Sequence, residues 1–234
     1  MIADSRGIFL WQFPRRIEDL RRQGVLSPVN IGREIIWARY LLIRQASQIN
    51  AFLNCARDFE TELTTGDYRL CIGHLDNIEK EFGFSLWTIE NRIAVVQLID
   101  GIEKQKAYMA SIRDSRSRND LVSYIAFQIS HRNEENATVG HFAEQVSMAL
   151  DSVKAHPEIR TYVLFRAAHK MPQTEDDVAI LLRYEQNSSN LDYYDTFIRL
   201  ATWAVVEGSE SPKNGFISQL AVLYDPPPIL QTPL

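Results

Sequence analysis

Apolar residues recur at helical spacing along most of the chain. From residue 85 onward they follow one another three or four residues apart, at Leu86, Ile89, Ile93, Val96, Ile99 and Ile102, and then at Tyr108, Met109 and Ile112. Such spacing places them on one face of a helix. It predicts a single continuous helix of about 27 residues, roughly 40 Å long, that serves as the central strut of the fold. Sustained alternation with a period of two is absent from the sequence, so we expect no sheet.

Short breaks divide the other apolar segments into further helices. Gly66 predicts the left-handed end of one helix, and Asp67 predicts the N-cap of the next. Gly83 and Ser85 repeat this arrangement, and Thr174, which precedes three acidic residues, predicts another helix start. Links this short make consecutive helices pack antiparallel. The sequence therefore predicts an all-α fold of about 9–11 helices, packed as antiparallel hairpins in an irregular solenoid or bundle.

The helix predicted to begin at Ser27 and Pro28 is apolar on more than one face. Its apolar residues are Ile35, Ile36, Trp37, Tyr40, Leu41, Ile43 and Ile49. A simple surface helix carries one apolar stripe. We therefore expect this helix to be well buried.

These helices fit one all-α domain over residues 1–225, and the polar segment 113–120 is the candidate point of subdivision. Residues 226–234 contain four prolines. That composition is typical of an extended tail or linker.

The second hairpin has a recognisable residue pattern. Gly66 and Tyr68 open its second helix, and small or apolar residues follow at Cys71, Leu75 and Ile78 before the terminator Gly83. Residues 46–84 thus resemble about one tetratricopeptide repeat. That family prefers Ala, an aromatic residue, Ala and Pro at the last four of these positions. The resemblance therefore implies tetratricopeptide-like geometry rather than membership of the family.

Charge is unevenly distributed over the 234 residues, whose net charge is −5. Residues 1–50 hold 8 arginines and 4 acidic residues, whereas residues 51–150 hold 10 basic and 15 acidic residues. A nucleic-acid-binding role is therefore disfavoured outside the basic N-terminal segment. In that segment, the predicted short helix 14–22 carries the candidate partner-binding residues Arg15, Arg16, Arg21 and Arg22. They form either a solvated face paired with the acidic middle of the protein, or a site for an anionic partner such as nucleic acid or an acidic protein surface.

The sequence predicts a cytoplasmic protein without a membrane span. No apolar run reaches the roughly 18 residues that a span needs, and the N-terminus lacks the features of a signal peptide. Cys55 and Cys71 have no flanking metal ligands, which favours free thiols in a reducing compartment.

The common catalytic and metal-binding motifs are absent from the sequence. It contains no Gly-x-Gly turn, Gly-x-Ser-x-Gly elbow, His-Glu-x-x-His helix or Cys-x-x-Cys pair. We therefore expect no cofactor and no metal. His131 lies near Glu134 and Glu135, and His141 lies near Glu144, which predicts surface hydrogen bonds or, alternatively, weak metal sites.

One short motif points to catalysis. Arg69 is followed after four residues by His74, which is similar to the active-site motif of the helical HEPN ribonucleases. The resemblance implies that Arg69 stabilises the phosphorane and that His74 acts as general acid or base. The family typically has a polar residue directly after the arginine, where this chain has Leu70. On a regular helix the two side chains point about 140° apart, so they converge only if the helix distorts or two chains dimerise.

Three functions remain open from the sequence. The first is a helical protein–protein interaction module, an adaptor or one domain of a larger assembly, that binds a protein or peptide partner. The alternative is a metal-independent ribonuclease that uses Arg69 and His74. The third is a structural subunit whose apolar surface is covered by a partner.

Overall fold

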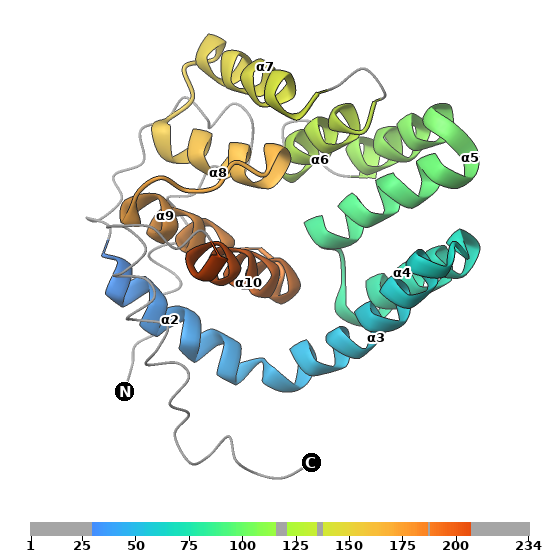
Figure 1. The fold of residues 1–234 in the computed structure, drawn as a ribbon, viewed down its shortest axis with the longest axis horizontal. Helices are drawn as coiled ribbons and strands as arrows, with labels where there is room; N and C mark the ends of the chain where they lie inside the picture. The colour runs from blue at the N-terminus through green and yellow to red at the C-terminus, as the bar shows by residue number, and fades with distance from the viewer. Residues whose placement is uncertain (1–29, 116–120, 135–137, 187, 207–234) are drawn as a thin grey trace.

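The computed structural model of the protein describes residues 30–115, 121–134, 138–186 and 188–206. These residues form helices and no strand, so the predicted all-α class is confirmed. The helices are α2 (Ile31–Arg44), α3 (Ala46–Thr65), α4 (Tyr68–Phe82), α5 (Leu86–Ser115), α6 (Leu121–Arg132), α7 (Val139–Ser152), α8 (Pro157–Ala168), α9 (Glu175–Glu185) and α10 (Asn190–Val206) (Figure 1). The predicted tail 226–234 lies outside the described residues.

The helices follow a ring-like course with α10 inside it (Figure 1). Helices α3, α4, α5 and α6 pack successively against one another, α8 packs against α6, α7 and α9, and α2 closes the ring by packing on α9. Helix α10 contacts α2, α3, α5 and α9. Elements that are far apart in sequence are thus joined through α9 and α10.

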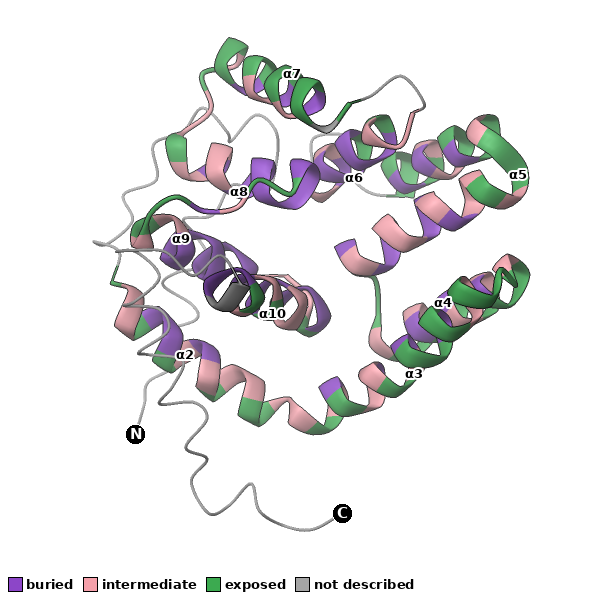
Figure 2. Ribbon diagram, in the orientation of Figure 1, coloured by how far each residue is buried: buried purple, intermediate pink, exposed green. Residues whose placement is uncertain are grey.

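Helices α8 and α9 contain the longest runs of buried residues (Figure 2). Burial is uninterrupted from Tyr162 to Ala168 in α8 and from Val178 to Glu185 in α9. Most of their apolar side chains belong to a cluster that also includes residues of α2, α5, α6, α7 and α10. Ile112 and Leu121, which flank the polar segment 113–120, lie in this same cluster.

The hairpin of α3 and α4 has the predicted caps. Gly66 is left-handed, with φ of 85°, and the Asp67 side chain accepts a hydrogen bond from the backbone N–H of Leu70. Cys71 and Leu75 are completely buried in a cluster with Phe59 of α3. The residues chosen for the inner face of α4 are therefore correct, while the tetratricopeptide resemblance stays a prediction.

The prediction of one continuous helix from Ser85 is wrong. Its start is confirmed, because the Ser85 hydroxyl accepts from the N–H of Thr88 and the Thr88 hydroxyl accepts from the N–H of Ser85. The helix breaks at Gly101, whose φ of 80° and ψ of −179° are not helical. This combination is essentially restricted to glycine. The two halves of α5 therefore do not form a straight strut. The longest buried runs lie in α8 and α9 rather than in α5.

Two further helix starts are set by side-chain caps. Thr174 and Asp177 form a capping box at the start of α9, as predicted. Helix α2 begins after Asn30, whose side chain accepts from the N–H of Arg33. The predicted start at Ser27 and Pro28 lies outside the described residues. None of the described helices combines the length and the apolar character that crossing a membrane requires, and both cysteines are free thiols.

Candidate interaction surface

The outer face of α2 carries a row of exposed apolar side chains. Ile36, Tyr40 and Ile43 are 68%, 43% and 42% exposed, and they follow one another at i, i+4 and i+7. Trp37 is half-buried beside them, and its ring stacks on that of Tyr40 with the centroids 5.2 Å apart. Residues at this spacing are neighbours on a helix surface. We call these four residues the apolar stripe.

The apolar stripe corrects the prediction that this helix is well buried. The opposite face of α2, which includes Ile35 and Ala38, is buried in the core as expected. Helix α2 packs on α9 and, less extensively, on α3 and α10. Because these neighbours cover only the inner face, the second apolar face predicted from the sequence lies at the surface.

Exposed apolar side chains elsewhere in the described structure are not arranged in a row of this kind. They occur in five different helices and in the loop between α4 and α5, at Leu70, Phe84, Leu98, Phe127, Met148 and Ile198. Exposed apolar residues scattered singly are ordinary in folded proteins. Ile36, Tyr40 and Ile43 differ from these, because they form a row on one helix.

The charges on the outer face of α2 are positive. Arg39 and Arg44 border the apolar stripe, and an Arg44 Nη1 donates to the Tyr40 hydroxyl at 3.4 Å. Neither guanidinium takes part in an ion pair with any described residue. Glu34 is the only acidic residue between positions 30 and 57 of the sequence, and its side chain is buried on the inner face.

Glu34 fixes α2 to α9. Its carboxylate accepts from Arg183 Nη2 at 3.1 Å and from Gln186 Nε2 at 3.0 Å. Both partners belong to the C-terminal end of α9, and the Glu34 and Arg183 side chains are almost completely buried. The apolar stripe is therefore displayed on a helix that is held to the core by apolar packing and by a buried ion pair.

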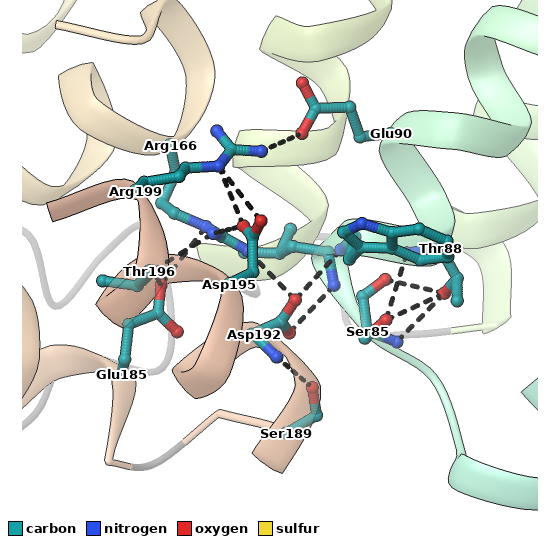
Figure 3. A network of polar contacts seen from close by, with 12 residues as sticks. Ser85, Thr88, Glu90, Arg166, Glu185, Ser189, Asp192, Asp195, Thr196 and Arg199 are labelled. Carbon is teal, nitrogen blue, oxygen red and sulfur yellow. Dashed lines mark hydrogen bonds and ion pairs between the residues drawn. The ribbon is translucent and has the colours of Figure 1, made fainter. Parts of the chain in front are cut away.

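A second set of buried charges lies where α8, α9 and α10 meet (Figure 3). Arg166 of α8 is 3% exposed. Its guanidinium contacts Glu185 Oε1 at 3.2 Å, Asp192 Oδ1 at 3.0 Å and Asp195 Oδ2 at 2.9 Å. It also donates to the hydroxyl of Thr196, which in turn donates to Glu185. One arginine thus links the C-terminal end of α9 to the first turns of α10.

Asp192 connects this network to α5. Its two carboxylate oxygens accept from the backbone N–H groups of Leu86 and Trp87, each at 2.9 Å. These are the first two residues of α5, whose N–H groups have no partner inside the helix. The N-terminus of α5 is therefore capped twice, locally by Ser85 and from α10 by a residue more than one hundred positions away.

Glu90 contacts a further group of cations, of which Figure 3 shows Arg199. Its carboxylate contacts Arg132 Nη2 at 2.6 Å, His169 Nε2 at 2.9 Å and Arg199 Nη2 at 3.3 Å. Burial alone would raise the pKa of Glu90, but the hydrogen bond from His169 and the charges of the two arginines hold it well below its usual range. Arg199 also contacts Asp195, which joins this group to the Arg166 network.

The chemistry of these networks is that of fixed ion pairs. Asp192, Asp195 and Glu90 are each in contact with at least one guanidinium. Glu185 differs from Glu90 in its pKa, which burial raises to about 7 although Arg166 stabilises the charged form. Its Oε2 is buried and has no hydrogen-bond partner among the described residues. The networks fix the relative positions of α5, α8, α9 and α10.

The two residues of the ribonuclease motif do not converge within the chain. Helix α4 is regular from Tyr68 to Phe82, so Arg69 and His74 leave it about 140° apart. Arg69 lines a shallow depression of about 390 Å³ at the start of α4, with residues 65–68 and Ile99, and His74 is not part of its lining. The ribonuclease alternative therefore depends on two chains meeting, and it stays a prediction.

The other candidate residues have simpler outcomes. Arg15, Arg16, Arg21 and Arg22 lie outside the described residues, so their partner-binding role stays a prediction. His131 pairs with Glu134 at 3.2 Å, as expected. His141 contacts Gln145 rather than Glu144. In the described ranges, no group of three or more His, Cys, Asp or Glu side chains is arranged to hold a metal ion.

Comparison of the chain with protein-family models, with curated proteins and with solved structures gives no match. Evidence for the function therefore comes from the residues of this chain. The sequence reasoning missed the apolar stripe, although it identified the signal, which is a helix with two apolar faces. It missed the buried charge networks because their members are separated by many residues in sequence.

Proposed function

We propose that this protein is a helical protein–protein interaction module, an adaptor or a subunit of a larger assembly, that binds a protein or peptide partner through the apolar stripe of α2. The observation that carries the proposal is the exposure of Ile36, Tyr40 and Ile43 in one row on a helix whose other face is fixed to the core. Transfer of such side chains from water to an interface is favourable.

The composition of this surface fits the proposal. Aromatic residues and arginine are enriched in protein interfaces and provide most of their binding energy. The stripe and its border contain Trp37, Tyr40, Arg39 and Arg44. The stacked rings of Trp37 and Tyr40 present a rigid area that loses little side-chain entropy on binding.

The contacts that hold the inner face of α2 to the core also fit the proposal. A surface that is already ordered before binding loses less entropy when the partner arrives. Burial of Ile35 and Ala38, together with the contact of Glu34 with Arg183, orders α2 in the unbound chain.

The test is affinity capture from the native host with three forms of the 234-residue chain, followed by mass spectrometry. Ile43→Asp places a charge in the stripe, and Ile198→Asp is the matched control, because both isoleucines are 42% exposed. We expect the wild type and I198D to retain the same specific partner and I43D to lose it, while circular dichroism shows all three equally folded. Equal capture by I43D, or no specific partner for the wild type, would contradict the proposal.

A further inference from the structure

We propose that the occupant of the apolar stripe is an acidic amphipathic helix of a partner protein. This inference rests on the proposed function, because it assigns a chemical class to the partner that binds the same surface. It is argued from the charges that border the stripe and from the hydrogen bonding of the α2 backbone.

The charges favour an acidic partner. Arg39 and Arg44 border the stripe and form no ion pair with a described residue, while Glu34 is turned into the core. A partner with Asp or Glu beside its apolar residues would place those carboxylates opposite the two guanidinium groups. Charge complementarity of this kind favours association and disfavours partners of the opposite sign.

The backbone chemistry favours a helical partner. The N–H and C=O groups in the interior of α2 are already used by its own hydrogen bonds, so α2 offers no edge to which a strand can pair. An extended peptide on the stripe would bury backbone groups that have no partner. A helix satisfies its own backbone, and its apolar residues at i, i+3, i+4 and i+7 match the row formed by Ile36, Tyr40 and Ile43.

Two occupants from this chain itself are disfavoured by charge. A symmetric contact between two copies of α2 would bring Arg39 and Arg44 of one chain near the same residues of the other. The apolar run at residues 8–13 is flanked by Arg6, Arg15 and Arg16. Like charges would oppose each other in both cases.

The test uses designed helical peptides and the 234-residue chain. The first peptide, of about 21 residues or six turns, has Leu at i, i+3, i+4 and i+7 and Glu at most other positions. The second has Lys in place of each Glu, and the third is a scrambled version of the first. Binding is measured by fluorescence anisotropy. We expect the acidic peptide to bind at least about tenfold more tightly than the other two, and less tightly as salt screens the charges.

The matched protein variants are Arg44→Glu, which reverses a charge beside the stripe, and Lys104→Glu, which makes the same change at an exposed position of α5. We expect R44E to lose about tenfold in affinity for the acidic peptide and to gain affinity for the Lys peptide. K104E should behave as the wild type. Equal binding of the acidic and Lys peptides, or equal effects of R44E and K104E, would overturn the inference.

Failure of this inference can be told apart from failure of the proposed function. If I43D abolishes capture of the native partner and R44E does not weaken it, the proposed interaction function is retained. The inference that the partner is acidic is then wrong. Two other results would also overturn the inference by naming another occupant. One is a dimer of the wild type that I43D dissociates, and the other is an intrachain cross-link from position 36 to residues 1–29.

Discussion

Arg166 Nε lies 3.2 Å from Glu185 Oε1, and both side chains are almost completely excluded from solvent. Two more carboxylates, those of Asp192 and Asp195, contact the same guanidinium. Removal of the arginine would leave three acidic groups close together in or near the core. Because a buried charge without its partner is strongly unfavourable, this arginine is central to the stability of the bundle.

Arg166→Met is therefore expected to reduce the free energy of unfolding by about 3 to 5 kcal/mol. Arg160→Ala is the control, because its ion pair with Asp151 is exposed and should cost less than about 1 kcal/mol. Urea unfolding followed by circular dichroism measures both. Equal losses in the two variants would show that the Arg166 network does not support the fold.

Asp192 is expected to matter more than an ordinary helix cap. Asp67→Ala removes the local cap of α4 and should cost about 1 kcal/mol. Asp192→Ala removes two hydrogen bonds to the start of α5 and a buried contact with Arg166, so a loss of about 3 kcal/mol or more is expected. Urea unfolding compares the two, and hydrogen exchange should show faster exchange at the Leu86 and Trp87 amides in D192A alone. A loss of stability in D192A no larger than that in D67A would show that Asp192 does not stabilise the start of α5.

Glu185 should make stability decrease as pH rises. Its pKa is raised from 4.5 to about 7 in the folded protein, chiefly by burial. Between these two values the folded state binds more protons than the unfolded state, so the contribution of this group to stability falls with increasing pH. Glu185→Gln does not titrate and should lack this dependence. Unfolding free energies at about pH 5 and about pH 8 should show the wild type losing stability relative to E185Q, and a constant difference would disprove the raised pKa.

Substitution by alanine should change the free energy of unfolding in opposite directions at two glycines. Gly73 lies within α4 and Gly101 within α5, and an added Cβ meets no atom within 4 Å at either position. At Gly73, Ala should raise the free energy of unfolding by roughly 0.5 to 1 kcal/mol, because the backbone there is helical. At Gly101, with φ of 80° and ψ of −179°, Ala should lower it by about 1 to 3 kcal/mol. Thermal unfolding separates these results, and stabilisation by Gly101→Ala would mean that α5 is not broken there.

Local features of the fold were predictable from the sequence. The caps at Gly66, Asp67, Ser85 and Thr174 act within a few residues of their own position, so composition at each break was enough to place them. The break at Gly101 was not predictable in the same way. Apolar spacing continues through it at Ile99 and Ile102, and a single glycine is tolerated within a helix.

Features that depend on distant residues could not be predicted. Asp192 caps a helix that begins 106 positions earlier, and no local pattern indicates such a contact. The exposure of Ile36 and Ile43 has a similar origin. Their hydrophobicity predicted burial, but the face of α2 that is buried is decided by its packing on α9 and by the contact of Glu34 with Arg183.

A partner protein bound to the apolar stripe of α2 would lie within reach of a reactive side chain at position 36. Site-specific photo-cross-linking in the native host detects such a partner, with a photo-reactive amino acid placed at Ile36 of the stripe or at Ile198 of α10 as control. We expect a covalent adduct with one partner protein from position 36 and none from position 198. Absence of an adduct at position 36, or the same adduct from both positions, would contradict it.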